Sequence, residues 1–354
     1  MSRLALLTEI PAPYRIPLFN ALAGRLDLSV LFLRASNPDR PYGSHADEFR
    51  FDSRVLAGRD LTVGGRWLVL NRGVRAALRA ADPEVMLLGG WNQPAFWAAA
   101  VWARRRRVPA VLWVESTGRD ARSGKLEPAK RMLLRAAAAF VVPGSASRDY
   151  LRKLGIPEAR IVVAPNAVDP AIFGVAADGR GATPPVVLAV GRLASEKGID
   201  VLLHATIDLP VDVVLAGTGP DENRLRSLAA PNVHFLGHVG RDELPALYAA
   251  ADVLAMPSRS DPWGMVLNEA AAAGLPLVST DAAGAAHDLI EDGVNGYRIP
   301  PDDVAALRNA LARLTSDPEL RAGMGERSRE LSRSFTPEAW ARVVADLAST
   351  LAAR

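Results

Sequence analysis

Two acidic residues separated by a tight turn are the first part of the sequence whose residue types suggest chemistry. Residues 258–280 read SRSDPWGMVLNEAAAAGLPLVST, which places Asp261 and Glu269 eight residues apart. Pro262 is typical of a turn or a helix start, so a helix is expected to begin between the two acids. A structural alternative is that Asp261 caps this helix and Glu269 is an exposed helical acid. The alanines after Glu269 instead indicate a closely packed helix, on which an acid needs a specific partner.

The turn between the two acids suits a ligand that approaches the main chain. Gly264 has no side chain to hold such a ligand away from the backbone. If the helix begins near Gly264, the N–H groups of Met265 and Val266 have no helical carbonyl to bind. The same start would place the carboxylate of Glu269 on the loop side of the fold.

Two cations follow an apolar run in VGRLASEKGID (190–200). Arg192 and Lys197 would stand close to a helix N-terminus, whose free N–H groups favour phosphate. The pair therefore indicates a diphosphate site. The alternative is a solvated loop that carries two ordinary surface cations.

Two neighbouring loops carry weaker signals. AGTGPDENRL (216–225) resembles a phosphate-binding glycine loop without its third glycine, and glycines before a helix more often serve the turn alone. In LGHVGRDELPALYAAAD (236–252), Val239 is predicted to end a strand and Asp242 to cap the next helix. A flat nucleobase can rest against such a strand end, and a plain structural edge is the alternative.

A scaffold of parallel strands is needed to bring these loops to one edge. Apolar runs of the first half, separated by helical patterns, predict strands at 4–9, 28–33, 85–90, 110–115, 140–145 and 161–166. The same alternation in the second half predicts strands at 185–192, 211–217, 232–239, 251–258, 275–280 and 295–300. Strands that are apolar almost throughout are typical of parallel sheets covered on both faces.

The expected architecture is α/β, with two Rossmann-like, doubly wound parallel-sheet domains that face each other across a cleft. An N-terminal domain at 1–173 and a C-terminal domain at 186–336 are separated by a linker at 174–185, which is rich in Gly, Ala and Pro. The amphipathic segment 337–353 is predicted to pack back on the first domain. Ligands of such sheets bind beyond the carboxyl ends of the strands.

Composition excludes several other classes of protein. The chain has 354 residues, a formal charge of +3 and no cysteine, so disulfides, thiolate metal sites and a cysteine nucleophile are excluded. The length predicts two domains rather than one. The apolar run near the start is too short for a signal sequence or a spanning helix. A cytoplasmic protein is therefore expected.

Taken in order, the loops of the second half resemble the retaining glycosyltransferases of the GT-B fold, specifically glycosyltransferase family 4. The resemblance rests on VGRLASEKGID, AGTGP, FLGHV and SDPWGMVLNEAAAAGLPLVST, followed by DLIEDGVNGYRIP. The first half resembles the family more loosely, through VVPGSASRDYLRKLG and VVAPNAVDPAIF. The resemblance implies a donor-binding second domain and an acceptor-binding first domain.

The family pattern implies a role for each matching residue of the second domain. Arg192 and Lys197 would bind the donor diphosphate, and Glu269 would hold the ribose hydroxyls. Asp261, which stands where the family usually has Glu, would face the transferred sugar. The remaining donor-binding residues implied are Val239, Trp263, Gly264, Met265 and Val266.

The first domain departs further from the family. Members commonly have a glycine-rich loop after the first strand, where this chain reads IPAPYRIP (10–17). Pro13, Tyr14 and Arg15 would therefore face the diphosphate and the acceptor. A histidine often follows the fourth strand in relatives, whereas this chain reads VESTGRD (114–120), which leaves Glu115 as the acceptor-side polar group.

The implied activity is transfer of a hexose-type sugar, with retention, from a nucleotide diphosphate sugar to a hydroxyl of a glycan, lipid-linked sugar or secondary metabolite. Charge on the leaving diphosphate has to be stabilised, and Arg192 and Lys197 suit that need. No obligatory metal and no other cofactor are expected, since Asp302 and Asp303 precede a helix and more plausibly cap it. The alternatives are a nucleotide-sugar epimerase on the same fold and a catalytically weak nucleotide-sugar binding protein.

Partners beyond donor and acceptor are less defined. A basic cluster of the first domain suggests peripheral contact with the cytoplasmic face of an anionic membrane, and a solvated helix end is the alternative. Its members are Arg104 to Arg107, Arg119, Arg122, Lys125, Lys130 and Arg131. No motif supports nucleic-acid binding. The sequence leaves open the donor nucleotide and sugar, the acceptor and the oligomeric state.

Overall fold

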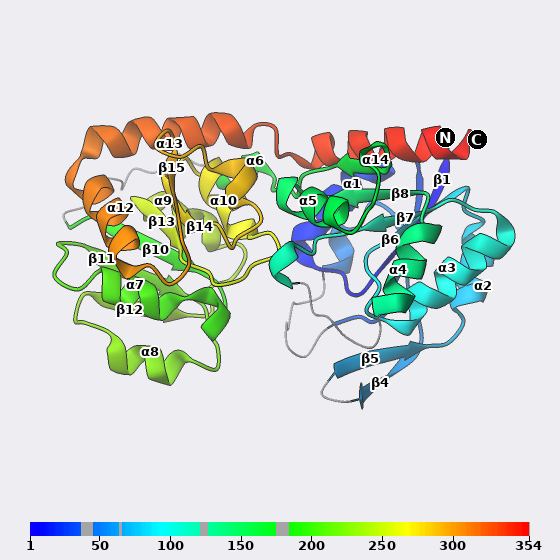
Figure 1. Cartoon of the computed structure of the whole chain (residues 1–354), viewed down its shortest axis with the longest axis horizontal. Coiled ribbons are helices and arrows are strands. Elements are labelled where there is room, and N and C mark those ends of the chain that lie inside the picture. The colour runs from blue at the N-terminus through cyan, green and yellow to red at the C-terminus, as the bar shows by residue number, and fades with distance from the viewer. Residues whose placement is uncertain (37–44, 64–65, 121–126, 175–183, 354) are drawn as a thin grey trace.

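The computed structural model describes residues 1–36, 45–63, 66–120, 127–174 and 184–353. It contains two parallel sheets, each flanked by helices, so the predicted fold class is confirmed (Figure 1). Most of the predicted linker, 174–185, lies outside the described residues, as do Arg122 and Lys125 of the basic cluster.

The first sheet has seven strands in the order β3-β2-β1-β6-β7-β8-β9, all parallel. Its strands are β1 (Arg3–Thr8), β2 (Asp27–Phe32), β3 (Asp52–Val55), β6 (Val85–Leu88), β7 (Ala110–Trp113), β8 (Ala139–Val142) and β9 (Ile161–Val163). The central strands are apolar because helices cover both faces. The helices of this half are α1 (Ile16–Ala23), α2 (Val74–Ala81), α3 (Pro94–Arg106), α4 (Glu127–Ala136), α5 (Ser145–Lys153) and α6 (Pro170–Phe173).

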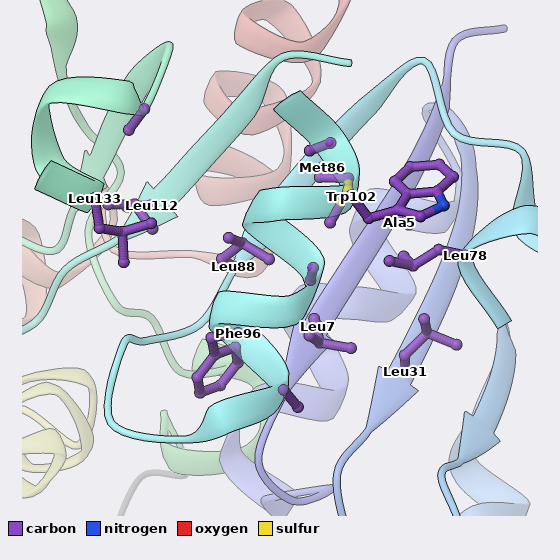
Figure 2. Close-up of a cluster of buried hydrophobic side chains, with 14 of the residues drawn as sticks. Ala5, Leu7, Leu31, Leu78, Met86, Leu88, Phe96, Trp102, Leu112 and Leu133 are labelled. Atoms are coloured by element: carbon purple, nitrogen blue, oxygen red, sulfur yellow. The ribbon is translucent and has the colours of Figure 1, made fainter. Parts of the chain in front are cut away.

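One face of this sheet is closed by α2, α3 and α4. Figure 2 shows Phe96 and Trp102 of α3 over the strands that carry Leu7 and Leu88. Large apolar side chains of this kind supply most of the free energy that holds a helix on a sheet. The packing fixes the loop after β6 next to the end of β1.

The other face is closed by α1 and by the last helix, α14 (Pro337–Ala352). Trp340 is fully buried there, with its ring centroid 5.1 Å from that of Trp113. The chain thus leaves the second half through α13 (Pro318–Ser332) and ends on the first half, as the orange and red helices along the top of Figure 1 show. This return ties the two halves together by chain connectivity.

The second sheet has six parallel strands in the order β12-β11-β10-β13-β14-β15. They are β10 (Val186–Val190), β11 (Asp212–Ala216), β12 (Val233–Gly237), β13 (Val253–Met256), β14 (Leu277–Thr280) and β15 (Gly296–Ile299). The remaining helices are α7 (Ile199–Ala205), α8 (Glu222–Leu228), α9 (Leu244–Ala250), α10 (Met265–Ala272), α11 (Ala286–Leu289) and α12 (Val304–Ser316). Apolar clusters fill both faces, one including α7 and α12 and the other α9, α10 and α11.

Strand order reverses once in each sheet. The reversal lies between β1 and β6 in the first sheet and between β10 and β13 in the second. Loops that diverge at such a point leave a crevice at the carboxyl ends of the strands. The crevice of the first sheet therefore lies at the loop after β1, and that of the second sheet lies at the loops after β10 and β13. These are the loops to which the sequence pattern assigns the chemistry.

Three strands were not predicted. Strand β3 forms the edge of the first sheet, and β4 (Gly58–Val63) pairs antiparallel with β5 (Arg66–Asn71) in a separate hairpin. Strand β12 ends at Gly237, so the prediction that Val239 ends it is wrong by two residues. Among the described residues, no helix combines the length and the apolar character that crossing a bilayer requires.

Candidate active site

The loop after β10 is shaped by close packing of backbone on backbone. Gly191 has φ +143°, a conformation that favours glycine. A Cβ placed on Gly217 would stand 1.9 Å from the carbonyl oxygen of Gly191, and one on Gly219 would stand 2.2 Å from that of Leu193. The glycines of AGTG thus let two loops pack against each other. This packing explains why glycines stand there, without a role in binding phosphate.

Lys197 and Asp261 meet across the two loops that the sequence singled out. Lys197 ends a short 3-10 helix, Ser195–Lys197, and its Nζ lies 2.5 Å from Oδ2 of Asp261. Their side chains are 26% and 13% exposed, so the pair is partly open to a ligand. Arg192 is more exposed and pairs with Glu196. Burial acts to raise the pKa of Glu196, but the hydrogen bond and charge of Arg192, a backbone hydrogen bond and the charge of Lys197 together outweigh it and hold that pKa below its ordinary value.

The Pro-Trp-Gly turn sets Asp261 beside the start of α10. The Oδ1 atom of Asp261 accepts a hydrogen bond from the backbone N–H of Trp263, 3.2 Å away. The residue that caps α10 is Gly264, at φ +98°, so the alternative in which Asp261 caps this helix is wrong. The left-handed φ explains the glycine, since a Cβ there would meet only the flexible end of the Met256 side chain, 2.7 Å away at Cε. Met265 and Val266 form the first turn of the helix, where N–H groups lack helical partners.

Glu269 has the specific partner that a half-buried helical acid needs. Its Oε2 accepts a hydrogen bond of 2.6 Å from the hydroxyl of Tyr248, which lies on α9. Burial raises the pKa of Glu269, and the hydrogen bond from Tyr248 with the charge of Arg241 only partly offsets it. Burial and the neighbouring carboxylate raise the pKa of Tyr248 well above its ordinary value. Glu269 is therefore not an ordinary exposed acid.

In the first half, Arg15 is held from several sides. It ends the 3-10 helix Pro13–Arg15 and donates from Nη2 to Oε2 of Glu115 at 2.8 Å. It also donates to Oγ1 of Thr8 at 3.2 Å and stacks over the ring of Trp113, with 4.5 Å to the centroid. Burial acts against the charge, yet the interactions with Glu115 and Tyr14 together keep the pKa of Arg15 above its ordinary value. Pro13 is buried beside it.

A cavity of about 390 Å³ joins the two halves. Thr8, Tyr14, Arg15 and Phe96 line it from the first half, and Arg192 lines it from the second. Two of the three residues predicted after β1 therefore share a cavity with a predicted diphosphate residue. Pro13 does not line this cavity.

Other predicted positions have structural roles or do not line the cavity. Val239 lies in the loop after β12, half-buried. The N-cap of α9 is Glu243, so the prediction that Asp242 caps this helix is wrong. Asp303 does cap α12 by accepting from the N–H of Ala306 at 2.8 Å. Asp302 instead pairs with Arg259.

The described members of the basic cluster are divided between different surroundings. Arg104, Arg105 and Arg106 are exposed in the last turn of α3. Arg119 instead forms an ion pair of 2.8 Å with Asp281 of the second half. Lys130 lies against the aromatic rings of Trp91 and Tyr150.

Several polar contacts between the halves were missed from sequence. Asp288 of α11 accepts hydrogen bonds from the backbone N–H and the hydroxyl of Ser145, at the start of α5. Asn268 of α10 donates to the carbonyl of Asn166 at 2.9 Å. Asn166 begins the NAVD element that supports the family resemblance. That element was the one signal in the sequence that could have drawn attention to Asn166.

The arrangement of two parallel-sheet α/β halves around a shared cavity is that of the GT-B fold. HepE of Anabaena, in a crystal structure in complex with UDP, superimposes with a TM-score of 0.77 over 99% of this chain and 100% of that one, at 20% identity. At this level of identity the similarity establishes the fold.

Sequence comparison identifies the family. Residues 176–331 match the family described as Glycosyl transferases group 1, and residues 13–167 match the Glycosyl transferase 4-like domain. The chain therefore belongs to the group 1 glycosyltransferases, with a family-4-like first domain.

Two curated relatives show how far the similarity extends. Alpha-D-kanosaminyltransferase of Streptomyces kanamyceticus is 33% identical over 157 residues, which cover 42% of this chain and 40% of that protein. Glycogen synthase of Mycobacterium tuberculosis is 29% identical over 352 residues, which cover 90% of this chain and 84% of that protein.

Proposed function

We propose that the protein is a retaining glycosyltransferase that moves a hexose-type sugar from a nucleotide diphosphate sugar to a hydroxyl acceptor. The observation that carries this proposal is the ion pair of Lys197 with Asp261, in the loop whose Arg192 lines the cavity shared by the two halves. Lys197 would give up part of its contact with Asp261 to the donor diphosphate. Asp261 would then face the sugar hydroxyls.

A nucleotide diphosphate sugar is supported as donor by the relatives and by the site. HepE has been crystallised in complex with UDP-glucose, and one relative in sequence is a glycogen synthase. In this chain, Arg192 lines the cavity, Lys197 adds positive charge from the same loop, and the first turn of α10 supplies N–H groups. Such groups stabilise the charge that develops on a leaving diphosphate.

Glu269 is proposed to hold the ribose of the nucleotide. Its carboxylate already accepts from Tyr248, which fixes the orientation of the side chain. A second oxygen remains to accept from a ribose hydroxyl. Trp263 to Val266 would cradle the sugar, and Val239 would lie beside the base.

The proposed reaction needs no metal, since the two cations stand where the diphosphate charge is to be neutralised. The acceptor class is a glycan, a lipid-linked sugar or a secondary metabolite, bound on the side of Tyr14 and Arg15. We place the protein in the cytoplasm, with peripheral contact to the membrane through the exposed arginines at the end of α3. The epimerase alternative gains no support from the matches described above.

A donor screen tests the proposal. We expect the melting temperature to rise with one class among UDP-, GDP- and TDP-sugars, and Asp261→Asn and Glu269→Ala to lose turnover with the same donor. Acceptor-dependent release of the nucleotide supports transfer. Binding without turnover supports the weak binding protein instead. Full turnover by both folded variants would show that the site has been placed wrongly.

A further inference from the structure

Trp263 reaches across the boundary between the two halves. A Cβ on Gly144, in the first half, would stand 2.6 Å from Cζ3 of the Trp263 ring and 2.3 Å from Oδ2 of Asp288. The ring is buried, and its Nε1 donates to Oδ1 of Asn268 at 2.8 Å. The turn that begins the proposed sugar cradle is therefore held by the first half as well as by its own domain.

Asn268 carries this contact into the backbone of the first half. Its side chain is 1% exposed, and its Nδ2 donates to the carbonyl of Asn166 at 2.9 Å. Both the acceptor and the donor of the amide are thus used, one on each side of the boundary. A buried amide with both groups bonded fixes the geometry of its partners, because any shift leaves a polar group unpaired.

Asn166 continues the connection to the cavity. Its own Nδ2 donates to Oε1 of Glu115 at 2.9 Å, and Oε2 of Glu115 accepts from Arg15 at 2.8 Å. Arg15 lines the cavity, and its Nη1 reaches Thr8 at the end of β1. An unbroken path of polar contacts runs from Trp263 through Asn268, Asn166 and Glu115 to Arg15.

We propose that Asn268 and Glu115 are positioning residues that hold the donor turn in register with the acceptor side of the cavity. This inference rests on the proposed function. Neither residue has to touch the donor, since both act through Trp263 and Arg15. Loss of either one should misalign the reacting groups, while nucleotide contacts within the second half remain. Small errors in alignment lower turnover strongly.

The test compares turnover with nucleotide affinity in Asn268→Ala and Glu115→Gln. The glutamine is isosteric, but only one of its two terminal atoms can accept a hydrogen bond. We expect kcat for release of UDP from UDP-glucose, or of GDP from GDP-mannose, to fall about 10- to 100-fold in each variant. The Kd for UDP or GDP should stay within about twofold of the wild type, because those contacts are local to the second half.

The double variant provides the sharper readout. If the two residues belong to one path, the combined loss of kcat should be close to that of either single variant. Multiplied losses, or a Kd that worsens in parallel with kcat, would overturn the proposal, because either result means two separate local defects. If Asn268→Ala does not fold, Trp263→Phe removes one donor from the same path and takes its place.

Arg119→Gln is the matched control, because it breaks an exposed ion pair between the halves that lies outside the path. Its kcat should stay within about twofold of the wild type, as expected for an exposed pair. An equal loss in the control would overturn the proposal, since any contact between the halves would then have the same effect. A wild type that binds neither UDP nor GDP contradicts the proposed function itself.

Discussion

The two sides of the cavity hold their charges in different ways. In the second half, Lys197 pairs with Asp261, and Arg192 pairs with Glu196 within the same loop while its side chain stays 54% exposed. In the first half, the Arg15 side chain is 12% exposed and contacts Glu115, Thr8 and the ring of Trp113.

This difference separates groups that can change partners from groups that cannot. A cation with one charged partner can exchange part of that contact for a diphosphate at small cost, because both contacts are ionic. Arg15 is itself the buried member of its pair and is also held by Thr8 and the ring of Trp113, so moving it to a diphosphate would break several contacts and leave the partly buried Glu115 without its ionic partner. The sequence pattern suggested a phosphate contact for Arg15, whereas its surroundings favour a positioning role.

The largest expected effect is on stability, from Arg15→Met. The substitution leaves Glu115 without its ionic partner, so the free energy of unfolding of the first half should fall by about 3–5 kcal/mol. Urea unfolding followed by tryptophan fluorescence measures it, since Trp113 lies under Arg15. Arg119→Met, in an exposed pair, is the control and should cost about 1 kcal/mol or less. Equal losses of unfolding free energy in both variants would mean that the Arg15–Glu115 pair is no more important for stability than an exposed ion pair.

The next effect is on catalysis, from Lys197→Met. Losing one preorganised charge at the leaving group should lower kcat by about 100- to 1,000-fold. Stability should change less than in Arg15→Met, because that substitution also removes the contacts of Arg15 with Thr8 and with the ring of Trp113. Steady-state release of nucleotide from the donor found in the screen gives kcat, and urea unfolding gives stability. A variant that keeps its turnover would show that Lys197 does not face the leaving diphosphate.

The fold was predictable because periodicity and apolar runs are local signals. Each of the twelve predicted strands overlaps a strand of the two sheets. Of the strands that were missed, β4 is polar and contains an arginine, and the apolar run of β5, WLVL (67–70), is only four residues long.

The site was only partly predictable, because its partners come from distant parts of the chain. The motifs identify Lys197 and Asp261, but no pattern indicates that they touch. Tyr248 as the partner of Glu269, and Asn166 as the partner of Asn268, depend on how helices and halves pack. Such contacts are set by tertiary structure, which a single sequence does not encode locally.

The smallest expected effect is a pH dependence at the contact between Asp288 and Ser145. Burial raises the pKa of Asp288, and the hydrogen bonds from Ser145 only partly offset it. A raised carboxyl pKa means that stability is lost as pH rises from the ordinary value of 3.8 through the folded value. Asp288→Asn keeps an acceptor without the charge, so its melting temperature relative to the wild type should rise over this window and then level off. A difference in melting temperature between Asp288→Asn and the wild type that stays constant with pH would contradict a raised pKa for Asp288.

The central claim is that Lys197 and its loop bind the donor diphosphate while Arg15 does not. The most direct test is the stabilisation by UDP or GDP of the wild type, Lys197→Met and Arg15→Met. Ligand at about 100 times its Kd should add about 2.7 kcal/mol to the wild type. We predict that this gain persists in Arg15→Met and is lost in Lys197→Met. An equal gain in both variants, or no gain in the wild type with either nucleotide, would contradict the account.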